Sequence, residues 1–368
     1  MYIHERKEWP NFTWDQTRVT ARLADTRHLQ GRLLGRMEAL GFALREEATL
    51  QSLTQEVLKT CEIEGVILDV EQVRSSIARR LGIDIGISPH VARNVEGIVE
   101  VMMDVTRNYN TPLTARRLFD WHAALFPTGR SGMHRITVGA WRGDSSGPMQ
   151  VVSGPAGRER IHFEAPDHER LKAEMDRFIR WFNGSIEMDL VLKSSLAHFW
   201  FITIHPFDDG NGRIARAISD MLLAKSEEST QRFYSMSSQI EKERSTYYQI
   251  LEKCQKGTLD ITLWLEWFLG CLKRAVEGSE ETLEAILTKA RFWKHHAGES
   301  FNDRQYSMAN RLLNGFEGKL TSSKWAKIQK CSQDTALRDI NNLVERKILR
   351  RERAGGRSTR YALITTEE

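Results

Sequence analysis

The sequence predicts a mainly α-helical protein in which β structure is confined to short hairpins. Two stretches indicate helices, because apolar residues recur at helical spacing in Leu190–Ile204 and again in Ile214–Leu222. A third observation indicates a hairpin, since two short runs, 149–152 and 160–163, flank a loop rich in Gly and Pro. The 368 residues suffice for two or three domains, which we place at 1–100, 101–275 and 276–368.

A tight loop separates the two central helices. The first helix is expected to end at His205, because Pro206 cannot donate the next helical hydrogen bond, and the second begins at about Gly212. Free backbone N–H groups and the helix dipole favour an anion at such a helix start. Gly210 and Gly212 let the backbone approach a phosphate closely. The Asn211-Gly212 pair could also mark a hairpin turn, but the flanking patterns are helical.

The side chains of this loop combine four kinds of chemistry. His205 titrates near neutral pH and can take a proton from a hydroxyl. Asp209 supplies a hard oxygen of the kind that Mg²⁺ accepts when it also binds substrate phosphates. Arg213 and Arg216 are three apart on one helix, so both can bind the same anion, and Asn211 adds a neutral donor. Together these residues predict a site for a nucleoside triphosphate.

The twelve residues from His205 to Arg216 resemble the signature of the Fic (filamentation induced by cAMP) family, H-x-F-x-[D/E]-G-N-G-R-x-x-R, at every defined position. The usual activity of that family is AMPylation, the transfer of AMP from ATP to a Ser, Thr or Tyr hydroxyl of a target protein. The resemblance implies that His205 deprotonates the target hydroxyl and that Asp209 holds Mg²⁺. It also implies that the glycine loop binds the α-phosphate region, Arg213 stabilises the departing pyrophosphate and Arg216 binds the γ-phosphate.

An upstream segment, Thr60–Gly65, fits the inhibitory pattern of the same family, [S/T]-x-x-x-E-[G/N]. The resemblance implies that Glu64 pairs with Arg216 and keeps that arginine from the γ-phosphate. An ordinary helix C-terminus with Gly65 as its cap explains the pattern equally well. In some relatives the same glutamate positions a water that removes AMP from modified targets. Auto-inhibition and de-AMPylation by Glu64 therefore both stay open.

The predicted hairpin, at 149–163, lies just before the core helices and resembles the flap of Fic proteins. That flap aligns the target by adding a strand to its edge, which makes Val151 and Val152 candidate docking residues. The alternative is a small surface hairpin. The preceding stretch, 129–147, is expected to be an irregular loop without a role.

A downstream stretch, Tyr247–Gln255, resembles the Y-Y-x-x-L-E-x-x-[N/Q] segment that closes the adenosine pocket in relatives. Tyr247 or Tyr248 would stack on the adenine, and the amide of Gln255 would bind its polar edge. The alternative is an amphipathic helix with a buried tyrosine. Within the first central helix, His198 is expected to pack in the core rather than to bind a metal.

The C-terminal region predicts two short helices, Ser322–Gln329 and Gln333–Arg346, at helix-turn-helix spacing. Seven Lys or Arg residues and one acid follow between Arg346 and Arg360, around a Gly-Gly turn. The arrangement resembles a winged helix, in which Arg357 and Arg360 are candidate DNA contacts. A protein-docking or dimer module is the alternative. A nucleotide-sensing, DNA-binding regulator is accordingly the main rival to an enzyme.

Composition and the remaining sequence limit the kinds of site and the cellular location that we expect. The formal charge of +4 is modest, and four cysteines without close pairs suggest neither a zinc site nor a disulfide framework. No apolar run reaches membrane-spanning length, and the charged first residues are no secretory signal, so we expect a cytoplasmic protein without a membrane partner. Its N-terminal region is mostly helical and resembles an extension found on one subgroup of Fic proteins. That region would pack the inhibitory helix against the core or form a homodimer.

Overall fold

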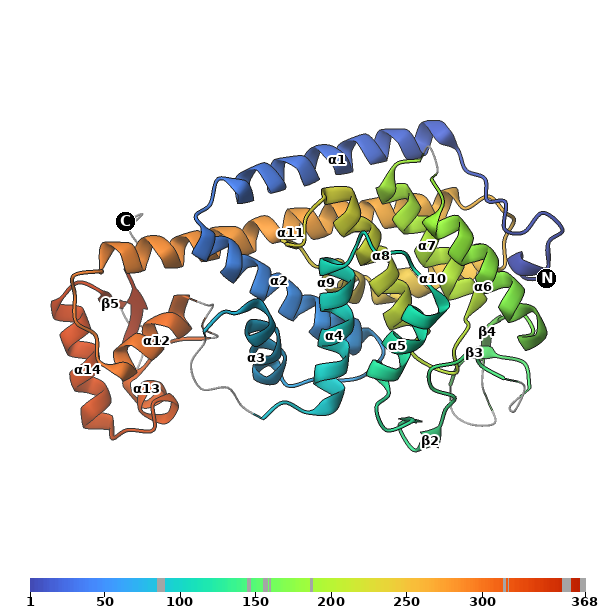
Figure 1. Ribbon diagram of the computed structural model, residues 1–368. Helices are drawn as coiled ribbons and strands as arrows, with labels where there is room; N and C mark the ends of the chain where they lie inside the picture. The colour runs from blue at the N-terminus through green and yellow to red at the C-terminus, as the bar shows by residue number, and fades with distance from the viewer. Residues whose placement is uncertain are drawn as a thin grey trace. The chain divides into compact units, whose positions relative to one another are not determined.

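The computed structural model describes residues 1–84, 90–143, 147–154, 158, 160–185, 188–313, 316, 318–352 and 359–364. The chain divides into two compact units, Met1–Ser279 and Glu280–Glu368 (Figure 1). The predicted domain borders at 100/101 and 275/276 lie within the helices α4 Arg93–Arg107 and α11 Thr262–His295.

The first unit is almost entirely helical, as the sequence predicts. Its helices are η1 Ile3–Glu5, α1 Gln16–Glu38, α2 Phe42–Ile63, α3 Val70–Leu81, α4 Arg93–Arg107, α5 Ala115–Leu125, α6 His168–Asn183, α7 Leu190–Ile204, α8 Asn211–Glu227, α9 Met236–Lys242, α10 Arg244–Gln255 and the start of α11 Thr262–His295. Two small hairpins complete it: β1 Arg130–Ser131 with β2 His134–Arg135, and β3 Gln150–Ser153 with β4 Arg160–Glu164.

Helices α7 and α8 form the centre of this unit and pack along each other. Every residue of α7 from Val191 to Ile204 is buried, so the helix is enclosed on all sides. Asp189 caps its start by accepting a hydrogen bond from the N–H of Val191 at 2.7 Å. The helix ends at His205, as predicted, and α8 begins at Asn211, one residue before the predicted position.

Helix α2 carries the predicted inhibitory motif and lies against α3, α4, α8 and α9. Its core-facing residues, among them Leu53, Val57 and Cys61, are buried. The helix ends at Glu64, and Gly65 follows with a φ of +78°, a conformation that favours glycine after a helix. Glu64 therefore lies at a helix C-terminus, the geometry that both interpretations of the motif require.

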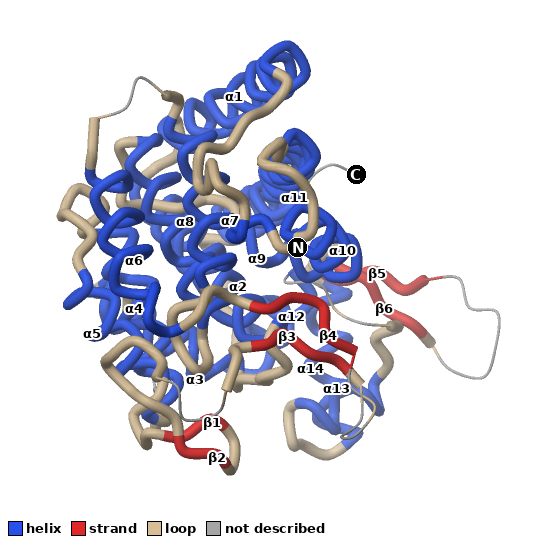
Figure 2. The backbone as a smooth tube through the Cα atoms, turned by 90° about the vertical axis from the view of Figure 1, so that its right-hand side faces the viewer, coloured by secondary structure: helices blue, strands red, loops and turns tan. Residues whose placement is uncertain are grey.

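The predicted hairpin at 149–163 is present as β3 and β4, two antiparallel strands with a bulge between Val151 and Val152 (Figure 2). Phe163 is buried on the inner face, where the rings of Tyr2 and His4 cover it. Val152 remains 48% exposed. Residues 155–157 of the predicted turn lie outside the described residues.

The second unit contains the end of α11, then α12 Asp303–Leu313, α13 Ser322–Ile328, α14 Gln333–Glu345, β5 Leu349–Glu352 and β6 Arg360–Leu363. Its core includes Phe292, Met308, Trp325, Ile340 and Tyr361. The two helices and the turn predicted here are confirmed, as are two antiparallel strands after them. The assignment as a winged helix stays a prediction. Arg360 lies at the start of β6, and Arg357 lies outside the described residues.

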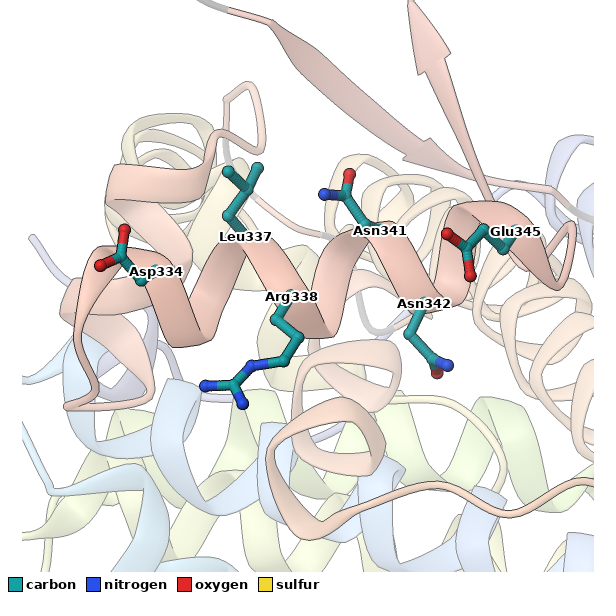
Figure 3. Close-up of a pocket in the computed structure, with 6 residues that line it drawn as sticks. All are labelled: Asp334, Leu337, Arg338, Asn341, Asn342 and Glu345. Atoms are coloured by element: carbon teal, nitrogen blue, oxygen red, sulfur yellow. The ribbon is translucent and has the colours of Figure 1, made fainter.

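Helix α14 presents a polar face with a shallow hollow beside it (Figure 3). Six residues of α14 line this hollow: Asp334, Leu337, Arg338, Asn341, Asn342 and Glu345. The hollow is distant in sequence from the loop at 205–216. Among the described helices, none combines the length and the apolar character that crossing a membrane requires.

Candidate active site

His205 occupies the turn between α7 and α8 in a left-handed conformation, with a φ of 52°. Its Nδ1 lies 3.2 Å from the carbonyl oxygen of Ile202. Because a carbonyl only accepts, this contact assigns the hydrogen to Nδ1 and leaves the lone pair on Nε2. Burial lowers the pKa of His205 to about 4. The imidazole is therefore neutral near pH 7, the state that a general base needs.

Asn211 holds the loop in shape. Its Oδ1 accepts from the N–H of Phe207 at 3.0 Å, and its Nδ2 donates to the carbonyl of the same residue at 2.8 Å. Phe207 is fully buried and stacks on His122 with ring centroids 4.2 Å apart. The amide of Asn211 was expected to face the anion, but both of its polar atoms bond within the loop. Its backbone N–H, at the start of α8, stays a candidate for nucleotide binding.

Gly210 and Gly212 let neighbouring groups come close to the start of α8. Gly210 has a φ of +83°, and a Cβ there would lie 2.8 Å from the ring of Phe126. A Cβ on Gly212 would lie 2.1 Å from Oε1 of Glu64. The carboxylate of Glu64 therefore lies directly against the first turn of α8, where the helix attracts an anion.

Arg216 is buried and bonds to the segment Thr60–Gly65. Its Nη2 donates to Oε1 of Glu64 at 2.8 Å and to the carbonyl of Thr60 at 2.8 Å, and its Nε donates to Oγ1 of Thr60 at 2.7 Å. Burial disfavours the charge of Arg216, but Glu64 together with Tyr247 and Tyr248 outweighs this effect, and the pKa of the guanidinium lies above its ordinary value. The ion pair expected from the motif is present in the structure.

Arg213 is also buried, but its guanidinium makes fewer close polar contacts to described residues than that of Arg216. Its guanidinium lies 4.8 Å above the ring of Phe126, and Nη2 is 3.9 Å from the carboxylate of Asp209. Its Nε has no hydrogen-bond partner in the described part of the chain. Buried donors without a partner are unusual in folded proteins, and this one lies where the resemblance expects pyrophosphate.

Asp209 lies with its side chain 41% exposed at the edge of the same hollow. The hydroxyl of Ser131 and, at 2.5 Å, the N–H of Gly210 donate to this carboxylate. His122 donates from Nε2 to the carbonyl of Asp209 at 3.1 Å, which fixes the backbone behind the carboxylate. The described residues contain no group of three or more metal-ligating side chains, so an Mg²⁺ ion here would depend on substrate oxygens besides Asp209.

The three residues predicted for adenine recognition lie on α10. Tyr247 is buried, and its hydroxyl bonds to Nε2 of His198 at 3.1 Å, while the amide of Gln255 donates to Oγ1 of Thr203 at 3.3 Å. Tyr248 is 38% exposed. Burial raises the pKa of both tyrosines, and the charges of Arg216 and Glu64 act on both of them. Of the three, Tyr248 therefore presents the most accessible ring beside the charged site.

Three residues contact the site in ways that the sequence does not predict: Thr60, Ser131 and Arg142. Thr60 belongs to the inhibitory pattern, but its double contact with Arg216 was not anticipated. Ser131 and Arg142 lie in the stretch 129–147 that was expected to have no role. Arg142 donates from Nε to the carbonyl of His205 at 2.9 Å. No pattern marks these two residues, because the fold alone brings them to the loop.

Comparison with known proteins agrees with this geometry. Residues 112–223 match the model of the Fic/DOC family, and residues 2–83 match a domain of unknown function (DUF4172). Two relatives are "Protein adenylyltransferase Fic" of Drosophila ananassae, 26% identical over 64% of this chain, and that of Culex quinquefasciatus, 24% identical over 66%. The chain spans less than half the length of these relatives, 43% and 45%.

Two solved structures share the fold. One is a Fic family protein from Desulfovibrio desulfuricans G20, with a TM-score of 0.55, 21% identity and coverage of 96% of this chain and 98% of that chain. The other is a Fic domain containing signaling protein from Bacteroides thetaiotaomicron, with a TM-score of 0.52, 19% identity and coverage of 71% and 97%. Residues 112–223 therefore form a domain that matches the Fic/DOC family.

Proposed function

We propose that this protein transfers AMP from ATP to a hydroxyl group of a target protein and that Glu64 restrains this activity. The relatives named protein adenylyltransferase support the first part. The observation that carries the proposal is the ion pair at the start of α8, where Arg216 lies 2.8 Å from Glu64. A carboxylate there occupies a place built for an anion, and that anion is the triphosphate.

The proposed reaction is an in-line displacement at the α-phosphorus. His205 accepts the proton of the target hydroxyl on Nε2, the only ring nitrogen left with a lone pair. The target oxygen then bonds to the α-phosphorus, the bond from that phosphorus to the bridging oxygen breaks, and pyrophosphate leaves. Arg213 and Arg216 bind the departing phosphates, and the N–H groups of the first turn of α8 bind the α-phosphate.

Mg²⁺ fits the donor set at Asp209. One half-exposed carboxylate beside a triphosphate is a usual magnesium arrangement, since the ion keeps waters and takes phosphate oxygens as further ligands. When bound, the ion would neutralise part of the phosphate charge. The hydrogen bonds from Ser131 and Gly210 orient the carboxylate for that purpose.

The flap and α10 supply the remaining contacts in this proposal. Val151 and Val152 on β3 would pair with an extended segment of the target, and the exposure of Val152 leaves that edge accessible. Tyr248 would stack on the adenine. Tyr247 and Gln255 would shape the floor beneath it, consistent with their burial and internal hydrogen bonds.

Labelling with ATP that carries a radioactive α-phosphate tests the proposal. The Glu64→Gly chain is expected to label protein much more strongly than the wild type, because Arg216 is released for the γ-phosphate. Glu62→Gly is the matched control, since the side chain of Glu62 pairs with Lys59 at 2.6 Å instead of with Arg216. The proposal fails if Glu64→Gly labels nothing, or if Glu64→Gly/His205→Ala labels as well as Glu64→Gly alone.

De-AMPylation is a second candidate, favoured by the position of the Glu64 carboxylate beside Arg216 and near enough to His205 for its charge to act on the imidazole. In that reaction, Glu64 would orient a water molecule instead of keeping a phosphate from Arg216. Proteins labelled by the Glu64→Gly chain provide the substrate. Release of AMP by the wild type, but not by Glu64→Gly, supports this activity, and equal release by both rejects it.

DNA binding by the second unit is a third candidate. Its support is the order of α13, α14 and the β5–β6 hairpin together with the exposed Arg350 and Arg351 on β5. The face of α14 is less favourable, because Asp334 and Glu345 flank Arg338 (Figure 3). Anisotropy of a labelled duplex should show binding that weakens steeply with salt and is lost in Arg351→Ala/Arg360→Ala. Equal binding by that variant contradicts the candidate.

A further inference from the structure

Arg142 lies between the β1–β2 hairpin and the flap and is 6% exposed. It makes three hydrogen bonds, and each ends on a backbone carbonyl. Its Nε donates to His205 at 2.9 Å, its N–H donates to Pro206 at 2.9 Å, and its Nη2 donates to Pro166. One residue thus binds both the catalytic turn and the segment that follows β4.

The burial of this guanidinium requires compensation, because a charge withdrawn from water is unfavourable unless polar groups replace the water. No carboxylate pairs with it within 4.0 Å in the described part of the chain, and Asp208 and Asp167 act only at longer range. Burial accordingly lowers the pKa of Arg142. Among the described residues, the carbonyls of His205 and Pro166 accept hydrogen bonds from the guanidinium, and Asp208 and Asp167 favour its charge from farther away.

We propose that Arg142 is the positioning residue of this site, which fixes the backbone of His205 and joins it to both ends of the flap. This inference rests on the proposed transfer reaction, in which His205 is the base and the flap holds the target. Arg142 precedes β3, and Pro166 follows β4. The guanidinium therefore closes the flap segment at its base and attaches that base to the catalytic turn.

The conformation of His205 explains why such a contact is needed. A φ of 52° is uncommon for a residue other than glycine, so the turn needs contacts that hold it. The Nε contact fixes the carbonyl of His205, while the contact of Nδ1 with Ile202 fixes the ring. The planar guanidinium group of arginine can donate to two carbonyls at once. The ammonium group of lysine, on its flexible side chain, cannot reproduce this geometry.

The test compares Arg142→Met and Arg142→Lys in the Glu64→Gly chain, with α-labelled ATP and the chain itself as acceptor. We expect Arg142→Met to lower kcat roughly 10- to 100-fold while the KM for ATP changes little, because the base is displaced and the phosphate site is not. Arg142→Lys should recover only part of the loss. Arg117→Met is the matched control, since Arg117 also donates to three backbone carbonyls but contacts α4 and the turn after it.

A second measurement does not depend on transfer activity. The ring of His205 is titrated by NMR in otherwise wild-type chains, where Arg142 opposes its protonation and Glu64 and Asp209 favour it. Arg142→Met should move this titration to higher pH and change the Nδ1–H signal, and Arg117→Met should do neither. The inference is overturned if Arg142→Met leaves the ring signals unchanged, or keeps the parent kcat. Failure of the Glu64→Gly parent to transfer AMP rejects the proposed function and leaves the NMR comparison decisive for Arg142.

Discussion

Asn211 shapes the loop between α7 and α8 through two hydrogen bonds to the backbone of Phe207. Asn183 makes the same pair of bonds to Leu113, 2.9 and 2.7 Å long, away from the loop. Replacing either asparagine by alanine leaves two backbone groups without a partner and should lower the free energy of unfolding by about 2 kcal/mol.

The two variants should differ in function. Asn211→Ala is expected to lose nucleotide binding and transfer in the Glu64→Gly chain, whereas Asn183→Ala keeps both. Urea unfolding gives the stabilities, and calorimetry with ATP and Mg²⁺ gives the affinities. If Asn211→Ala retains the affinity of the parent chain for ATP, the loop does not need the two hydrogen bonds from Asn211 to Phe207.

Buried histidines make the stability depend on pH. Burial lowers the pKa of His198 to about 3, whereas an unfolded chain protonates histidine near pH 6.5. The unfolded state therefore binds more protons between those values, so stability is complete above about pH 6.5 and falls as the pH drops toward 3. The loss should reach about 3 kcal/mol by pH 4 and about 5 kcal/mol toward pH 3. His205 acts in the same direction down to a pKa of about 4.

Urea unfolding at a series of pH values checks this dependence. The His198→Gln chain should show a smaller fall in the free energy of unfolding between pH 6.5 and 4 than the wild type. The exposed His134 provides the control, and His134→Gln should follow the wild type. Identical slopes for all three chains would contradict the account.

Single residues were predicted from sequence where a local pattern marks them. The glycines, the arginines of α8 and Asp209 occupy fixed places along one turn, so their neighbourhood follows from their spacing. Ser131 and Arg142 reach the loop across more than sixty residues of chain, through contacts that only the folded structure defines. Asn211 was placed correctly, but the partner of its amide was not foreseen.

At the scale of elements, α2 is held in place by Glu56, eight residues before Glu64. Glu56 is 4% exposed and accepts from the hydroxyl and the N–H of Ser237 and, at 2.7 Å, from the hydroxyl of Ser235. These serines begin α9, the main partner of α2. The contact fixes the helix that presents Glu64 to Arg216.

Glu56→Ala should therefore weaken the proposed restraint without touching the nucleotide site. We expect labelling by α-labelled ATP to rise several-fold above the wild type but to stay below that of Glu64→Gly. The double variant should match Glu64→Gly, because Glu56 acts through Glu64. Gln55→Ala, on the exposed side of the same helix, should behave as the wild type. If the effects of Glu56→Ala and Glu64→Gly on labelling add up in the double variant, Glu56 does not act through Glu64.

Helices and strands were predicted where local sequence signals mark their ends. The bounds of α7 follow from the Asp189 cap and from Pro206, and the hairpin follows from alternation around a Gly- and Pro-rich turn. The packing of α2 against α8 and α9 depends on contacts between distant segments. The motif at Thr60 indicated this arrangement only through its resemblance to a family.

At the scale of the whole molecule, every described residue of the candidate site lies in the unit Met1–Ser279. A chain that ends after Ser279 should therefore fold and bind ATP with Mg²⁺ within about twofold of the full-length affinity, when both carry Glu64→Gly. Circular dichroism and calorimetry check folding and binding. A folded truncated chain that does not bind ATP would mean that the second unit contributes to the site.

We propose that the first turn of α8 is a triphosphate site that Glu64 occupies in the resting protein. A crystal structure of the Glu64→Gly chain with Mg²⁺ and a non-hydrolysable ATP analogue tests it most directly. We expect the γ-phosphate within hydrogen-bond distance of Arg216 and the α-phosphate facing Nε2 of His205. A nucleotide bound elsewhere, or a turn without phosphate at saturating analogue, would contradict it.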